Sequence, residues 1–125
     1  MLNQSGVTKT SAGTRKTILY DTKVFFALSI KVSDSGVELK DGKKIIKAGT
    51  ILAGDKNDRD TAFTVATGKT DVVAILEHDV DVTNGEANGS AIFFGFIDES
   101  KLDGDVKEKL TPDVKSAIPA IQFFD

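Results

Sequence analysis

The sequence predicts a mainly β protein, a small β-rich α+β domain with short helices near the C-terminus and a flexible N-terminal arm. Three observations predict this. The chain has 125 residues, which suits one domain. Its β-branched and aromatic residues gather in short runs separated by Gly, Asn and Asp, the pattern of strands joined by turns. Hydrophobic residues make up 40% of the chain and charged residues 28%, so most of it can bury a core.

The start of the chain differs in composition from the rest. Residues 1–16 are dominated by Ser, Thr and Gly and hold few large apolar side chains. They bury too little surface to offset the entropy of ordering, so we predict a flexible arm over residues 1–17 and a β-rich domain over residues 18–125. Residues 1–23 carry a net charge of +3 and the remainder −6. The arm is either a tail without function or a segment that orders by adding a strand to a partner's sheet edge.

The body of the domain carries a series of short strand signals. Lys23–Val32 is rich in β-branched and aromatic residues and alternates in its second half. The Asp-Gly dipeptide at 41–42 favours a tight type I′ hairpin between two short apolar segments, Val37–Leu39 and Lys44–Ile46. The polar stretch Ala53–Thr61 predicts a surface loop. Further short strands are expected at Ile51–Leu52, Thr61–Ala66, Val72–Leu76 and His78–Val82.

The last third combines the strongest strand signal with a helix signal. Ala91–Ile97 is predicted as a strand in which Gly95 marks a bulge or the close approach of another segment. The Thr-Pro-Asp run at 111–113 predicts a helix start, because Thr caps the first turn, Pro suits its first position and an acid complements the helix dipole. Pro119 ends this helix, and Ala120–Phe124 predicts a closing apolar strand.

No recognisable active site is present in the sequence. Cysteine is absent, and His78 is the only histidine, so thiolate chemistry and histidine clusters are excluded. On a strand, His78 shares a face with Val80 and Val82, away from the neighbouring carboxylates. The acidic loop at 55–60 fails the spacing of a calcium loop, and the GKT run at 68–70 lacks the earlier glycine of a phosphate-binding loop. We therefore expect no enzyme activity, no catalytic residue, no cofactor and no metal.

Several segments form a pattern in order and spacing. An AGT turn followed by aliphatic residues and a glycine lies at 47–54, and a D-V-D-x-T-x-G-x-A run at 79–87 leads into an apolar strand that ends in glycine. A terminal apolar strand lies at 118–123. Over Lys47–Asp125 the chain resembles the lambda-type head decoration proteins of bacteriophages, and also the capsid-binding domain of phage head fibre proteins. The residues that carry the pattern are Ala48, Gly49, Thr50, Asp79, Asp81, Thr83, Gly85 and Gly95.

The resemblance implies a compact β-tulip-like subunit, commonly a homotrimer, at three-fold or quasi-three-fold points on the capsid exterior. It implies a role in stabilising the expanded head. The implied partners are the major capsid protein and further copies of the chain, and the implied location is the virion, after synthesis in the bacterial host cytoplasm. No membrane contact is expected, because no apolar run approaches the length of a span. No nucleic-acid contact is expected, because the basic segment has few cations and one aromatic ring.

Within that function, the arm is predicted to add a strand to an edge presented by the capsid protein. Its backbone supplies hydrogen bonds, and its cations contact acidic shell surface. A trimer engages several capsid subunits at once, so weak individual contacts become tight. The predicted capsid-binding residues are Val7, Thr8, Lys9, Thr10, Arg15, Lys16 and Thr17.

The main alternative is a capsid-anchored head fibre or a host- or glycan-adhesion module. An adhesion module predicts an exposed aromatic platform, and with no Trp and one Tyr the sequence offers little for one. The eight Phe residues lie chiefly in apolar runs, which are typical of a core or a subunit interface. A small phage hydrolase is a further alternative, and its mechanism would depend on His78.

Overall fold

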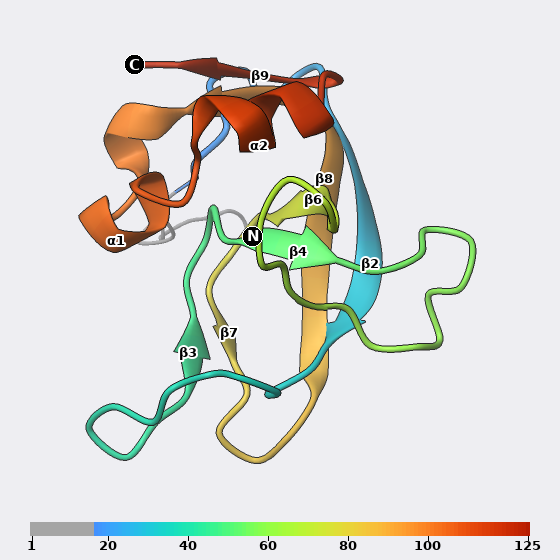
Figure 1. The fold of residues 1–125 in the computed structure, drawn as a ribbon, viewed down its shortest axis with the longest axis vertical. Coiled ribbons are helices and arrows are strands. Elements are labelled where there is room, and N and C mark those ends of the chain that lie inside the picture. Colours follow the sequence, from blue (N-terminus) through green and yellow to red (C-terminus); the bar gives the residue numbers. More distant parts are fainter. Residues whose placement is uncertain (1–16) are drawn as a thin grey trace, which may run out of the picture.

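The structure is a computed structural model that describes residues 17–125. It is mainly β, as the sequence predicts, and is built on a six-stranded sheet with short helices in the last quarter of the chain (Figure 1). The strand order is β2-β8-β6-β4-β5, and β9 pairs with β8 beside this path. The strands are β2 (Phe26–Val32), β4 (Ile51–Ala53), β5 (Thr64–Val65), β6 (Val72–Leu76), β8 (Ala87–Asp98) and β9 (Ile121–Phe124).

The long strand β8 organises the sheet. Its residues 87–94 pair antiparallel with the full length of β2, and Ala91 and Ile92 also pair with β6. Its second half pairs with β9, the one parallel partner, from Gly95 to Asp98. Leu19 forms an isolated antiparallel bridge with Ile97 in the same half. Segments from both ends of the described chain therefore meet at one end of β8.

A separate two-stranded ribbon, β3 (Ile45–Ile46) with β7 (Val80–Asp81), extends from the sheet. The predicted turn is confirmed: Lys40 and Lys43 exchange backbone hydrogen bonds of 2.8 and 2.9 Å, and the two residues between them have φ of 52° and 78°, as a type I′ turn requires. The predicted strand pairing around this turn is wrong. β3 pairs with β7, because burying Ile46 against the domain outweighs extending an isolated hairpin in solvent.

Strand boundaries also differ from the prediction at several points. The first strand begins at Phe26, because the Asp21 carboxylate accepts the Lys23 amide at 2.8 Å and bends the chain there. The segment expected at Thr61–Ala66 is a strand only at Thr64–Val65, and the segment expected at His78–Val82 only at Val80–Asp81. The predicted boundaries of Val72–Leu76 are confirmed.

The short helices follow β8. A 3₁₀ turn, η2 (Glu99–Lys101), starts where the Asp98 carboxylate accepts the Ser100 amide, and α1 (Gly104–Lys107) follows it. The helix α2 (Pro112–Ala117) begins as predicted, with the Thr111 hydroxyl accepting the Val114 amide and Pro at the first position. Within residues 17–125, no helix is long and apolar enough to cross a membrane.

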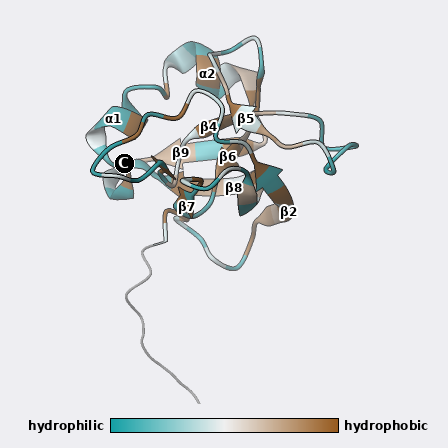
Figure 2. Cartoon of the chain, turned by 90° about the horizontal axis from the view of Figure 1, so that it is seen from below, coloured by the Kyte–Doolittle hydropathy of each residue, from teal (hydrophilic) through white to brown (hydrophobic). Residues whose placement is uncertain are grey.

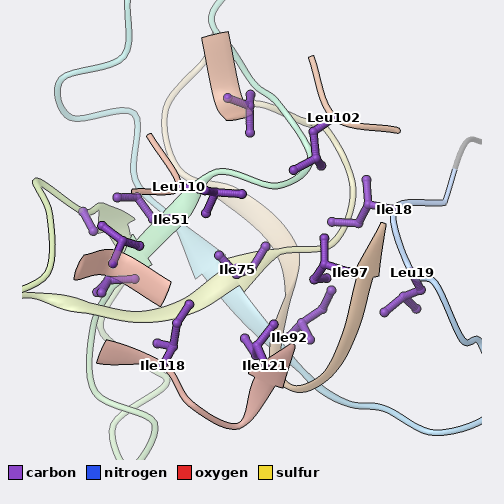
Figure 3. Packing of buried hydrophobic residues seen from close by; sticks show 14 residues of the cluster. Ile18, Leu19, Ile51, Ile75, Ile92, Ile97, Leu102, Leu110, Ile118 and Ile121 are labelled. Carbon is purple, nitrogen blue, oxygen red and sulfur yellow. The ribbon is translucent and has the colours of Figure 1, made fainter. Parts of the chain in front are cut away.

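Both faces of the sheet are covered. On one face, Leu102, Leu110 and Ile118 from the helical segment pack over Ile75 and Ile92 (Figure 3). The other face packs under the β3–β7 ribbon and Phe63. Strand β6 contributes to both clusters, which explains its continuous apolar sequence. The loop between β4 and β5 projects away from this core and is hydrophilic, as predicted (Figure 2).

A charged pair fixes the helices to one another. Lys115 of α2 donates to the Glu99 carboxylate of η2 at 2.9 Å, and Glu99 is 9% exposed. The Lys115 ammonium also lies 5.3 Å from the ring centre of Phe123 in β9. Three elements at the C-terminal end of the domain, η2, α2 and β9, therefore contact the same cation.

Candidate interaction surface

The residues of the AGT turn and the first aspartate of the D-V-D run form one unit. The Ala48 amide donates to the Asp79 carboxylate at 2.7 Å, across 31 positions of sequence. The Gly49 amide donates to the Leu76 carbonyl at 2.7 Å, and the Thr50 hydroxyl to the Lys47 carbonyl at 2.6 Å. These bonds fix the turn against the end of β6.

The second aspartate closes the β3–β7 ribbon. The Asp81 carboxylate accepts the Thr83 amide at 2.9 Å and its hydroxyl at 2.5 Å, and these bonds lower the pKa of Asp81, the hydroxyl contributing most. The Thr83 hydroxyl oxygen in turn accepts the Lys44 amide at 2.9 Å. Gly85 follows with φ of 112°, a conformation that favours glycine. Asp81, Thr83 and Gly85 are thus structural residues of a turn.

Gly95 lies apart from the other pattern residues, in β8 beside β9. Its φ is 151°, and a Cβ placed there would lie 3.0 Å from the Cβ of Phe25. The prediction of a close approach at Gly95 is confirmed. The register irregularity between β2 and β8 falls nearby, between Phe26 and Ala27.

Of the predicted capsid-binding residues, only Thr17 belongs to the described part of the chain. Val7, Thr8, Lys9, Thr10, Arg15 and Lys16 lie outside it. The Thr17 hydroxyl accepts the Leu19 amide at 3.2 Å. The next residues run beside β8, where the Asp98 backbone amide donates to the Ile18 carbonyl at 2.8 Å and the Tyr20 backbone amide donates to the Phe96 carbonyl at 2.7 Å.

Next to this attachment point lies a continuous set of aromatic rings, which we call the aromatic row: Phe26, Phe94, Phe96, Phe124 and Tyr20. Phe26 and Phe94 are directly opposite partners on β2 and β8, so they share a face. The following ring centres are 6.5 Å (Phe94–Phe96), 6.0 Å (Phe96–Phe124) and 5.1 Å (Phe124–Tyr20) apart. Tyr20 is 62% exposed, Phe26 53%, Phe94 44% and Phe124 43%.

The expectation that the chain offers little exposed aromatic surface is therefore wrong. Composition counts rings, whereas exposure depends on which strand face they occupy. The signal was present in the sequence, since Phe94 and Phe96 are two positions apart and must share a face of a strand. The sequence alone does not place these two rings on the outer face, because that depends on the pairing of β8 with β9.

The rim of the aromatic row carries charges of both signs. A hollow of about 440 Å³ next to Tyr20 and Phe124 is lined by Asp21 and Lys23 as well as by these rings. Asp125, the residue after Phe124, forms an ion pair with Lys107 at 3.6 Å. The end of the row at Tyr20 and Phe124 thus adjoins charges of both signs.

The only histidine lies elsewhere. His78 Nε2 is 3.4 Å from Glu77 Oε2, so the prediction that His78 faces away from the carboxylates is wrong for Glu77. The reason is that residues 77–79 lie between two strands, where side chains no longer alternate. Glu77 also accepts the Ser90 hydroxyl at 2.7 Å. His78 Nδ1 is buried and, among the described residues, has no hydrogen-bond partner.

Two sequence segments that superficially resemble ligand-binding loops have internal roles. In the acidic loop, the Asp55 carboxylate accepts the Asn57 amide at 2.8 Å, and Arg59 donates to the Ser29 carbonyl of β2 at 3.0 Å. In the GKT segment, the Asp71 carboxylate accepts the Thr67 amide at 2.9 Å and the Gly68 amide at 3.0 Å. These backbone amides therefore already donate hydrogen bonds to carboxylates of the same chain.

Within residues 17–125, no three His, Asp or Glu side chains come together in a way that could hold a metal ion. Comparison with protein-family models finds no match to the chain, and comparison with curated proteins finds no relative.

Proposed function

We propose that this protein is a non-enzymatic structural component of a bacteriophage virion. It binds the outer surface of the capsid, as a homotrimer at three-fold or quasi-three-fold sites, and stabilises the expanded head. Its partners are the major capsid protein and other copies of itself.

One observation carries this proposal: the two segments of the decoration-protein pattern contact each other. Along the sequence, the AGT turn and the D-V-D run are separate short patterns that occur in many proteins. In the structure, the Ala48 amide binds the Asp79 carboxylate at 2.7 Å, and the Gly49 amide binds the last residue of the strand before it. Chance matches to short patterns have no reason to form one hydrogen-bonded unit, so this contact supports a shared fold.

The position of Thr17, the first described residue, is consistent with such a role. It lies near the end of β8, close to the aromatic row, and residues 1–16 are joined to the body there. An arm that binds the capsid there places the whole end of the domain against the shell. Its positive charge then complements an acidic shell surface.

The proposal is tested by sedimenting the protein with expanded phage heads that lack decoration protein. The full chain should co-sediment, and the chain without residues 1–16 should lose at least 10-fold in apparent affinity, because its strand pairing and its charge contacts are both removed. A variant with Lys9, Arg15 and Lys16 changed to Gln should bind heads more weakly than the full chain. The difference in affinity between the two should become smaller as the salt concentration rises.

The matched control changes three exposed lysines of the body, Lys56, Lys101 and Lys109, to Gln. This variant has the same net charge as the arm variant and should bind like the full chain. Equal loss in the two variants would show that only net charge matters. Undiminished binding by the truncated chain would refute the role of the arm, and no binding by the full chain would refute the proposal as a whole.

The aromatic row also favours the second candidate, a capsid-anchored adhesion module. Exposed rings such as Tyr20 and Phe124 are what such a module would present. That candidate predicts that the protein binds host-cell surface glycans, and that changing these two residues abolishes this binding while leaving head binding intact.

A further inference from the structure

The aromatic row exposes far more apolar area than a single exposed apolar side chain does, and it reaches the size of the largest apolar patch on a typical monomer. Four of its rings are between 43% and 62% exposed, and Val24 (49%) and Phe25 (38%), which directly precede Phe26 in the sequence, are exposed as well. Taking about 200 Å² for a fully exposed aromatic side chain and somewhat less for valine, the patch exposes roughly 500 Å². The largest apolar patch on a monomer is usually about 300–600 Å² and is often functional.

This area can be compared with what a specific protein contact needs. Two copies that cover each other's patch bury roughly 1,000 Å² in total, whereas three copies that meet at their patches bury roughly 1,500 Å² in total, or about 500 Å² for each pair. A specific interface requires at least about 1,000 Å². The aromatic row alone therefore reaches the size of a contact between two copies and supplies about half of each contact in a trimer, where the polar rim adds the remainder.

The chemistry of the row favours a protein surface over a sugar. Sites for small polar ligands place a few hydrogen-bonding groups among the apolar ones. The five rings of the row offer a single hydroxyl, that of Tyr20. Enrichment in aromatic residues with an apolar centre and a polar rim is, in contrast, the usual composition of a protein interface.

The rim favours a second copy over an unrelated, strongly charged partner. Asp21 and Lys23 lie beside Tyr20 and Phe124, and Asp125, the residue after Phe124, pairs with Lys107, so both signs are available near this end of the row. A surface with both signs can complement itself when a symmetry axis brings two copies together.

We infer that copies of this chain contact one another through the aromatic row. The inference deepens the proposed function and rests on it for the number of copies, three. The contact places Tyr20 and Phe124 of each copy at the subunit interface, close to Thr17, the residue to which the arm is joined.

The first test uses the unmodified protein without any phage head, so that its outcome is independent of head binding. Sedimentation equilibrium from micromolar to about millimolar concentration should show a mass that rises from 13.3 kDa to three times that value. Tyr20 is the only tyrosine and there is no tryptophan, so tyrosine fluorescence reports directly on the row. Quenching of this fluorescence by acrylamide should fall several-fold over the same concentration range.

The second test changes the row. The Phe94→Thr/Phe124→Thr variant removes two half-exposed rings and should remain at 13.3 kDa at every concentration. The control variant, Leu39→Thr/Val65→Thr, removes two exposed apolar residues that lie outside the row, and should associate like the unmodified chain. Circular dichroism of each variant establishes that it is folded.

Three results would overturn the inference. The unmodified chain could stay at 13.3 kDa up to millimolar concentration. It could associate while Tyr20 remains equally accessible to acrylamide, which would place the contact elsewhere. The row variant, folded, could associate as the control does. In each case, head binding by the full chain would still leave the proposed function standing.

Discussion

Replacing Gly49 with alanine should destabilise the protein far more than the same change at a comparable glycine. Gly49 has φ of 94°, which costs an L-residue about 1–2 kcal/mol. An added Cβ would also lie 2.6 Å from Leu102 Cδ2 and 3.0 Å from Val106 Cγ1, both on buried side chains. Overpacking of this kind costs about 1–3 kcal/mol. Together these effects lower the free energy of unfolding by about 3 kcal/mol.

Gly42 provides the matched control. Its φ of 78° imposes a similar backbone cost, but nothing lies within 4 Å of an added Cβ. Gly42→Ala should therefore cost about 1–2 kcal/mol. The difference between the two variants isolates the collision with the helical segment. Most of this difference should disappear when Gly49→Ala and Gly42→Ala are compared in a Leu102→Ala background, because Leu102 Cδ2, the nearest colliding atom, is then absent and only Val106 Cγ1 remains close.

The assay is urea unfolding followed by far-ultraviolet circular dichroism at one fixed protein concentration, since association would make stability concentration-dependent. For a chain of this length, about 3 kcal/mol also lowers Tm by roughly 10 °C. If Gly49→Ala and Gly42→Ala were equally destabilising, or if the Leu102→Ala background left the difference unchanged, the packing of the AGT turn against the helical segment would not have the energetic role assigned to it.

Two further perturbations test other parts of the scaffold. Hydrogen bonds from the backbone amides of Thr67 and, to a lesser extent, Gly68 lower the pKa of Asp71 below its ordinary 3.8. The stability that Asp71 contributes is therefore complete above about pH 4 and is lost as the pH falls through the lowered value. In urea unfolding, Asp71→Asn should be less stable than the unmodified chain at pH 7 and the difference should close in acid, whereas a difference independent of pH would contradict this. Lys115→Met leaves the Glu99 carboxylate, 9% exposed, without its cationic partner. This should lower the free energy of unfolding by about 2 kcal/mol, a modest loss because Lys115 itself is partly exposed. Adding Glu99→Leu should recover most of the lost stability, and thermal unfolding of both variants would show whether the second change restores Tm.

Local signals in the sequence predicted local structure well. The Thr-Pro start of α2 and the positive-φ turn at 41–42 depend on neighbouring residues only, and both are confirmed. The continuous apolar run of β6 was recognised as a strand with its observed bounds. α1 was missed because Val106 is its only buried residue, so the segment shows no apolar period.

Pairing between distant segments could not be predicted. β3 and β7 are 34 or more positions apart, and their register follows from burial of Ile46 and Val80 rather than from any turn. The parallel pairing of β9 with β8 determines that Phe96 and Phe124 meet on the outer face. The aromatic row is a product of this pairing, which explains why composition alone gave a wrong expectation.

The common attachment of both ends of the body to β8 has a practical consequence for display. Ile18 and Tyr20 bind β8 at Asp98 and Phe96, and β9 binds the same residues from the other direction. A cargo fused after Asp125 would therefore emerge beside Ile18 and Tyr20, the first residues that bind β8. The hairpin tip at Asp41-Gly42, at the opposite end of the long axis, is exposed and far from both (Figure 1). An inserted peptide would be presented there without obstructing either end.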